Sequence, residues 1–434
     1  MMRHTLVFAA LMSALPAMAA NANLSAVYQM ARENDADFAA ARENYKAGQE
    51  KIPQGRAGLL PTINLGAKAG RNVSQTNIVG SNGYYNSHSV SLSLTQPLYR
   101  KQNLEAFEQA KIQALLSEQQ LKLAEQKLLL SVAEAYFSVL QAQDVLATAQ
   151  AQKKAYAEQL AQARKSFEVG ASTITDTHEA QARYDLTEAQ EIAASNDLEV
   201  KRRSLEKIIN AETPELAHLT EGVRMSLPEP NKMDAWVKQA EEGSVAVQLN
   251  QSAVELARRD VERLRGGHYP TLDLAASYST SDTPSKSSIV TSTRGGSIGV
   301  ELGWLIYQGG AIDSRVREAV AIKEKTRFEL ESARRQSRLD ARQGFLGVLS
   351  GDAQVKALEQ ALVSSEAQLK STKLGLEVGV RTRVDVLNAQ QQLFTTRRDL
   401  SAARYQTLLA GLQLKAAAGS LQEDDLKAVD SLLK

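Results

Sequence analysis

Two stretches of this sequence are long enough, and free enough of proline, to form helices of unusual length. No proline occurs between Lys101 and Phe167 or between Ala311 and Leu376, and other helix-breaking residues are few. At about 1.5 Å per residue, either stretch would be a rod of roughly 100 Å. A globular domain cannot contain such a rod, so the chain must be elongated.

The sequence also repeats once, at an offset of 209 residues. Residues 167–181 align with residues 376–390, and 7 of these 15 positions are identical, where about one is expected by chance. A period this long indicates two fused copies of a domain-sized unit, not a solenoid.

Each half carries the same order of predicted elements. The first repeat, 20–210, is predicted to contain a helix, a β-hairpin at about 61–99, a long helix at about 101–168 and a return helix at about 174–210. The second repeat, 233–420, is predicted to contain a helix, a hairpin at about 270–307, a long helix at about 311–377 and a return helix at about 382–418. Residues 211–232, rich in proline, form a linker or equatorial segment, and 421–434 form a C-terminal tail.

The N-terminus has the pattern of an export signal. Arg3 precedes an apolar run from Leu6 to Leu15, and Ala17-Met18-Ala19 resembles a cleavage site, so residues 1–19 are predicted to be a signal peptide. The alternative of a short membrane anchor is disfavoured, because about ten apolar residues cannot span a bilayer of roughly 30 Å. Nothing after the signal is a run of 18 apolar residues.

Composition excludes several classes of function. With 51 basic against 50 acidic residues, the chain has no net field that would attract nucleic acid. The absence of cysteine removes disulfides, thiolate metal sites and cysteine nucleophiles. The five histidines lack ligand spacing, and no phosphate-binding or nucleophile motif occurs. We therefore expect no enzyme activity, no metal and no cofactor.

The predicted hairpins alternate apolar and polar residues with a period of two. Val90, Leu92 and Leu94 alternate with serines in the first half, and Ile298, Val300 and Leu302 follow the same period in the second. Four strands cannot close a barrel, whereas three chains would supply twelve strands, enough for an outer-membrane barrel with an aqueous lumen. An ordinary half-buried sheet on a globular domain is the alternative.

Several motifs resemble those of the TolC family of outer-membrane channel-tunnel proteins, and the resemblance covers essentially the whole mature chain. They are Leu60-Pro61-Thr62, Gln96-Pro97-Leu98-Tyr99, Ile306-Tyr307-Gln308-Gly309-Gly310 and the stretch from Glu377 to Gln390. The resemblance implies a mixed α/β membrane protein, a homotrimer whose twelve-stranded β-barrel continues into a helical coiled-coil tunnel in the periplasm.

The same resemblance implies a function and partners. The protein would be the exit duct of a tripartite export system for small molecules or secreted proteins, joined through a periplasmic adaptor protein to an inner-membrane ABC or RND-type transporter. The turns at Gly170 and Gly379 would dock the adaptor. A soluble periplasmic coiled-coil scaffold is the alternative function.

The family also implies a gate at the periplasmic mouth. Arg381 matches a latch arginine, Asp176 its aspartate partner and Thr175 its threonine partner. Leu376 stands where the family has a tyrosine, so one hydrogen bond of the latch is lost.

Two rings of the family's pore fall on Asp385 and Asn388, and the asparagine halves the expected charge. Asp385 would favour cations if it lines a narrow axis. Its alternative role is that of an acidic residue at the start of a helix.

Overall fold

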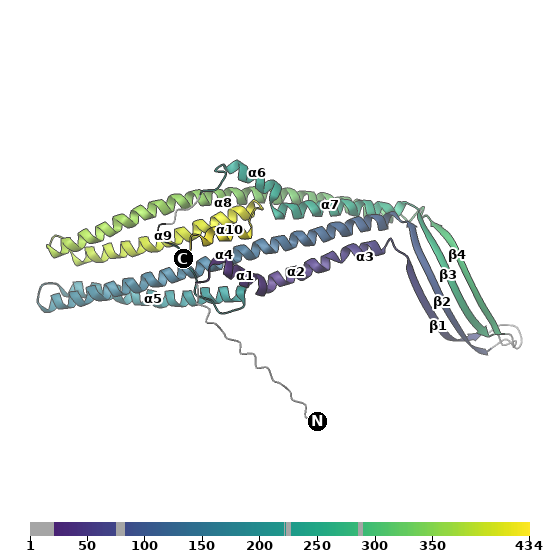
Figure 1. The fold of residues 1–434 in the computed structure, drawn as a ribbon, viewed down its shortest axis with the longest axis horizontal. Coiled ribbons are helices and arrows are strands. Elements are labelled where there is room, and N and C mark those ends of the chain that lie inside the picture. The colour runs from purple at the N-terminus through teal and green to yellow at the C-terminus, as the bar shows by residue number, and fades with distance from the viewer. Residues whose placement is uncertain (1–20, 75–82, 221, 223–226, 285–289) are drawn as a thin grey trace, which may run out of the picture.

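The protein is described by a computed structural model that covers residues 21–74, 83–220, 222, 227–284 and 290–434. The expected signal peptide, 1–19, lies outside the described residues. The chain is elongated, with two helical hairpins at one end and a sheet at the other (Figure 1). The helices are α1 (Leu24–Asn34), α2 (Ala36–Gln49), α3 (Lys51–Ala57), α4 (Lys101–Glu168), α5 (Ile174–Ile209), α6 (Met233–Gly243), α7 (Val245–Arg265), the short 3-10 helix η1 (Gly266–His268), α8 (Ala311–Glu377), α9 (Arg383–Ala417) and α10 (Glu423–Asp430).

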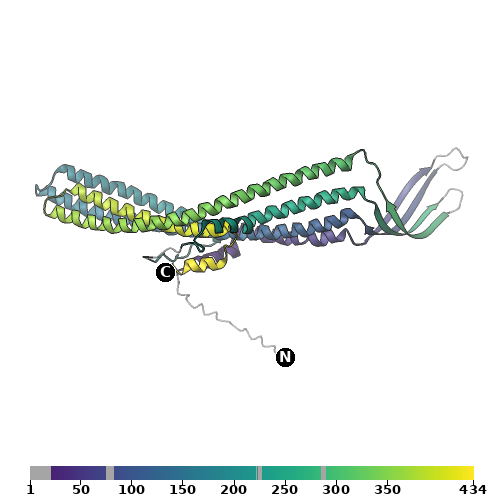
Figure 2. The same ribbon diagram turned by 90° about the horizontal axis from the view of Figure 1, so that it is seen from above.

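The two long helices, α4 and α8, run from the sheet to the far tips of the molecule (Figures 1 and 2). On the sheet side, α2 and α3 pack along α4, and α7 packs on both α8 and α4. On the tip side, α5 returns along α4 and α9 returns along α8. Each half therefore has one continuous long helix, along which shorter helices pack.

The shorter helical stretches are more broken than the sequence analysis expected. The stretch expected to be one helix at 24–54 forms α1, α2 and α3 instead. The break between α2 and α3 is at Glu50, and the break between α1 and α2 is at Asp35, which is extended and serves two helix ends. Its backbone N–H donates to Ala31 O at 2.7 Å and ends α1, while its side chain accepts from Phe38 N at 2.7 Å and caps α2. The 233–265 stretch is divided at Ser244, whose backbone N–H donates to Ala240 O at 3.1 Å and ends α6, and whose side chain makes no capping hydrogen bond to α7.

The largest hydrophobic core lies halfway along the molecule, around the middle of α4. Buried side chains of α4 between Leu128 and Ala142 pack there against α1, α9, α10 and the end of α5. Residues 211–220 and 431–434 close this region through bridges from Leu216 to Ala22 and from Leu219 to Leu433. We call α1, α10 and these two segments the equatorial layer.

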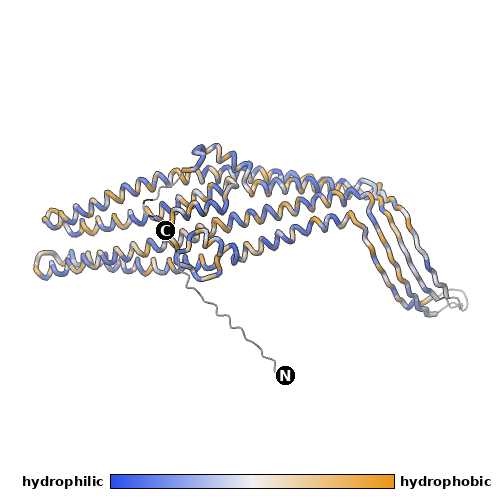
Figure 3. The backbone as a smooth tube through the Cα atoms, viewed as in Figure 1, coloured by the Kyte–Doolittle hydropathy of each residue, from blue (hydrophilic) through white to orange (hydrophobic). Residues whose placement is uncertain are grey.

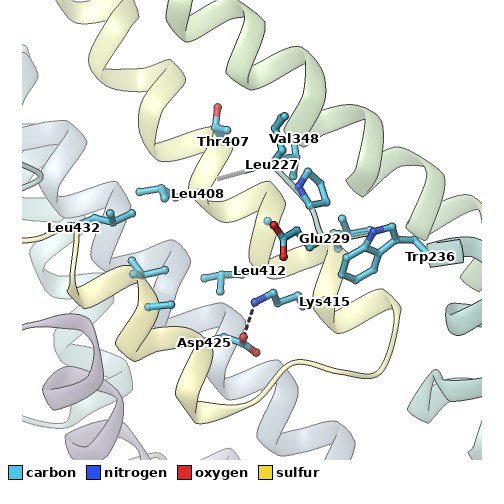
Figure 4. A pocket seen from close by; sticks show the side chains of 15 residues that line it. Leu227, Glu229, Trp236, Val348, Thr407, Leu408, Leu412, Lys415, Asp425 and Leu432 are labelled. Atoms are coloured by element: carbon cyan, nitrogen blue, oxygen red, sulfur yellow. Dashed lines mark hydrogen bonds and ion pairs between the residues drawn. The ribbon is translucent and has the colours of Figure 1, made fainter. Parts of the chain in front are cut away.

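The predicted C-terminal tail is part of this layer, since it contains α10. A pocket of about 450 Å³ lies between α6, α9 and α10, with Trp236 at one side (Figure 4). At its edge Lys415 Nζ of α9 lies 2.6 Å from Asp425 Oδ1 of α10. The Asp430 carboxylate accepts from Leu24 N at 2.8 Å, so α10 also holds the start of α1.

The sheet consists of β1 (Thr62–Ser74), β2 (Gly83–Tyr99), β3 (Thr271–Pro284) and β4 (Val290–Gly303), all antiparallel and in that order. Hydrophobic and polar residues alternate along the strands (Figure 3). The register aligns Ile63, Leu94, Ala276 and Ile298 across the sheet, and it aligns Asn64 with three serines in the next row. One face is therefore apolar and the other polar, and β1 and β4 have unpaired edges within the chain.

Candidate functional site at the helical mouth

The tips of both helical hairpins are the same glycine turn. Gly170 has φ +72° and Gly379 has φ +78°, a conformation that glycine adopts without a Cβ penalty. In the first turn Gly170 N donates to Phe167 O at 2.9 Å and Ala171 N donates to Ser166 O at 2.8 Å, the Schellman pattern that ends a helix. The second turn repeats this pattern.

Apolar side chains surround these turns without being buried in the chain. Val169 is 78% exposed, and Val378 and Val380 are 65% and 75% exposed. Exposed apolar residues gathered at a tip are typical of a surface that a partner covers.

Both return helices begin with the same capping box. Thr173 and Asp176 form it at the start of α5, and Thr382 and Asp385 form it at the start of α9. The Asp385 carboxylate accepts from Thr382 N at 2.8 Å and from Thr382 Oγ1 at 2.9 Å. The backbone hydrogen bond from Thr382, aided by its hydroxyl and by the charge of Arg381, lowers the pKa of Asp385 below its usual value. Asp385 therefore stabilises a helix start and also carries a persistent negative charge.

The predicted latch residues lie at the tips of the two hairpins, and no hydrogen bond or ion pair joins Arg381 to Asp176 or Thr175 among the described residues. Asp176 is engaged in its capping box, where it accepts from Thr173 N at 3.0 Å. Among the described residues, the side chains of Arg381 and Thr175 form no hydrogen bond or ion pair. The Arg381 side chain instead lies over Gly375, where an added Cβ would come within 2.6 Å of Arg381 Cγ. Leu376 is half-buried beside it.

Asn388, the second predicted ring residue, is in contact with the other hairpin. Its Oδ1 accepts from Arg183 Nη2 of α5 at 3.2 Å, and Arg183 Nη1 donates to Gln391 Oε1. A second arginine crosses in the opposite direction, because Arg383 Nη2 of α9 donates to Ser166 Oγ of α4 at 2.5 Å. These contacts have no signal in the sequence, since the repeat aligns Arg183 with Gln392, which is not an arginine.

A further contact joins the hairpins nearer the equatorial layer. Asp144 of α4 accepts from Tyr405 Oη of α9 at 3.0 Å and from the Ser401 hydroxyl. The Tyr405 ring also stacks on Phe137, with ring centres 5.8 Å apart. Burial, together with the Asp144 charge, raises the pKa of Tyr405, so its hydroxyl stays protonated and able to donate.

A cluster of possible metal ligands and a helix able to span a membrane are both absent from the part of the chain that the structure describes. Within the described ranges, His, Asp and Glu side chains do not gather into any group of three that could hold a metal ion. Of the helices in these same ranges, none has both the length and the apolar character needed to cross a membrane.

A paired-repeat chain with a four-stranded sheet at one end and two long helical hairpins at the other has the architecture of outer-membrane channels. Solved structures with this fold include CusC, with a TM-score of 0.81 and 17% identity over 93% of this chain and 95% of that one. The Campylobacter jejuni CmeC outer membrane channel has a TM-score of 0.81 and 16% identity over 94% of this chain and 89% of the other.

The chain belongs to the outer membrane efflux protein family, whose model matches residues 27–211 and 236–420. It is 34% identical to outer membrane protein TolC of Escherichia coli over 95% of this chain and 85% of that protein. It is also 34% identical to the alkaline protease secretion protein AprF of Pseudomonas aeruginosa, over 93% and 85%.

The two matched segments are displaced by 209 residues, the offset found in the sequence, so the internal repeat is confirmed. The expected fold class, outer-membrane location and transport function are confirmed as well. The alternative of a soluble periplasmic scaffold does not agree with this family.

Proposed function

We propose that three copies of this chain form a single outer-membrane duct, through which an inner-membrane transporter exports small molecules or proteins. The sheet carries this proposal, because it has one apolar face, one polar face and an unpaired edge at each side. Unpaired edges are not tolerated in lipid, and three sheets joined edge to edge would close a twelve-stranded wall with the apolar face outward.

Protein secretion and small-molecule efflux are both compatible with such a duct. Relatives are named for alkaline protease secretion and for outer membrane efflux, and this chain matches both kinds over more than 90% of its length. We infer that the cargo is chosen by the transporter and not by the duct.

The hairpin tips are the proposed docking site for a periplasmic adaptor protein. The turns at Gly170 and Gly379 present exposed valines that no other described residue covers. Cross-linking from cysteines placed beside these two turns should capture the adaptor, whereas cysteines placed on the sheet side of α7 should not.

The mouth between the tips is the proposed gate. Asp385 would line the narrow axis, and Arg381 would reach Asp176 and Thr175 of a neighbouring protomer, since these groups are not bonded within one chain. Leu376 supplies no hydroxyl to this link, so we expect it to be weak. A charge reversal at Arg381 that leaves channel opening unaltered would remove the latch assignment.

The duct itself is tested by fractionation and electrophysiology. The protein should sediment with outer membranes, run as a heat-sensitive trimer after detergent extraction, and form ion channels in planar bilayers. A monomer that is released with the soluble periplasmic fraction would contradict the proposal.

A further inference from the structure

We propose that Arg183 and Arg383 form a clasp between the two helical hairpins of one protomer and thereby hold the mouth in its resting state. This inference rests on the proposed function of the tips as a gate. The clasp consists of Arg183 with Asn388 and Gln391, and of Arg383 with Ser166.

The clasp is distinguished from other polar contacts near the tips by the elements that it joins. Arg183 lies on α5 of the first hairpin, and both of its amide partners lie on α9 of the second. Arg383 lies on α9, and its hydroxyl partner lies on α4 of the first hairpin. If the hairpins separate at this level, all three contacts break together.

The setting of the arginines favours a bonded state. The Arg183 side chain is 25% exposed, and Glu179, one turn earlier on α5, lies 3.6 Å from its Nη2 and steadies the charge. Arg383 is more enclosed, because its Nη1 is buried without a hydrogen-bond partner among the described residues. The two bonds of Arg183 are exposed and that of Arg383 is partly buried, and in all three the charged donor strengthens the hydrogen bond relative to a neutral one.

The clasp also explains how the mouth holds together when the expected latch is weak. Leu376 cannot donate a hydrogen bond, and Asp176 is occupied by its capping box. Asn388, in place of an acidic ring residue, offers a neutral oxygen that Arg183 binds. The contact between the hairpins thus supplies part of the hold on the mouth that was expected of the Arg381 latch.

The first test replaces the arginine and compares two matched positions. Arg164 of α4 donates to Gln181 of α5 at 2.6 Å, so this bond lies within the first hairpin. Purified trimers of Arg183→Ala should show an open-channel probability in planar bilayers about tenfold above the unmodified protein, since a hydrogen bond to a charged group is lost. Arg164→Ala should leave it unchanged. Equal behaviour of the two variants would overturn the clasp.

The second test closes the contact covalently. Because the sequence contains no cysteine, only the introduced cysteines can react. Cysteines at positions 183 and 391 are linked with a short bifunctional methanethiosulfonate reagent that reducing agent removes. The linked trimer should have low conductance, and reduction should raise it. Linking cysteines at positions 164 and 181 should have no effect on conductance.

The outcomes separate the clasp from the duct. After denaturation the linked 183–391 chain should run as a monomer, and a covalent dimer or trimer would show a contact between protomers and overturn the clasp. The clasp would also be overturned if the cysteines at positions 183 and 391 could not be linked, or if the linked and reduced trimers had the same conductance. If the unmodified trimer forms no channel at all, the proposed function fails instead.

Discussion

At the residue scale, Asp385 has two roles that a single measurement can separate. Its pKa is lowered by hydrogen bonds from Thr382, so the folded protein keeps this carboxylate charged at a pH where an ordinary aspartate is half protonated. A lowered pKa means that its stabilising charge is fully present above the ordinary value and is lost only as the pH falls through the folded one. We expect the cation preference of the channel to be unchanged from pH 7 to pH 5 and to be lost only at lower pH.

The matching variant is Asp385→Asn, which keeps a side-chain oxygen for the helix cap but removes the charge. The reversal potential under a salt gradient should shift toward lower cation preference, and the thermal stability should change little. An unchanged reversal potential would refute the pore assignment of Asp385 and leave it as a helix cap.

A second residue-scale prediction concerns the polar contact between the hairpins at Tyr405. Tyr405→Phe removes a donor to Asp144 while keeping the ring that stacks on Phe137. Loss of one hydrogen bond to a partly buried charged acceptor should lower stability by about 1.5–3 kcal/mol. The temperature at which the trimer dissociates on a gel should fall. Tyr45→Phe is the control, because among the described residues no hydrogen bond is made by the Tyr45 hydroxyl, and it should leave this temperature unaltered.

Some of these residues were predictable and others were not. The acidic residues Asp176 and Asp385 follow a glycine turn by six positions in both repeats, and the rule that acids favour helix starts identifies them. Arg183 and Asp144 have no such signal, since their partners lie more than 200 residues away on another hairpin. The rotation of one hairpin about the other decides these contacts, and no local pattern specifies it.

At the element scale, the separation of α8 and α9 depends on glycine. A Cβ added at Gly344 would lie 3.0 Å from Leu414 Cα, an atom that belongs to the backbone of the facing helix. Gly344→Ala must therefore push the helices apart and should cost about 1–3 kcal/mol. A Cβ added at Gly411 of α9 would meet no atom within 4 Å, so Gly411→Ala should be neutral or stabilise by up to about 1 kcal/mol. The midpoint of thermal denaturation should fall for Gly344→Ala and should stay the same or rise for Gly411→Ala.

Helix interruptions and the equatorial layer show the limit of element prediction. The absence of proline predicted the long helices, because nothing in those stretches competes with helical bonding. The break at Asp35 needs no proline, since one side chain caps a new helix. The apparent tail after residue 420 contains α10, whose Asp430 binds the start of α1 more than 400 residues earlier. Such contacts depend on the tertiary arrangement.

At the scale of the whole molecule, the elongated shape follows from the length of the helices and from their charge. Helices as long as α4 and α8 cannot fold into a globule, and they carry too many charged residues to lie in a bilayer. The sheet has the opposite character, since its apolar face includes Leu65, Leu92 and Val300, exposed at 76%, 46% and 61%. The chain therefore separates into a part suited to lipid and a part suited to water, and the helical end must project from the membrane.

Two substitutions at adjacent positions of β2 test this division directly. Leu92 pairs with Leu65 and Tyr278 on the apolar face, whereas Ser91 pairs with Gly66 and Ser279 on the polar face. Arginine on a lipid-facing position near the bilayer midplane costs about 2–4 kcal/mol per chain, and a threefold assembly bears that cost three times. Leu92→Arg should therefore abolish the heat-sensitive trimer in outer membranes. Ser91→Arg should assemble normally and alter only ion selectivity, because its charge would enter the hydrated lumen. If the two variants assemble equally well, the apolar face is not the lipid face, and the closed wall built from it cannot be correct.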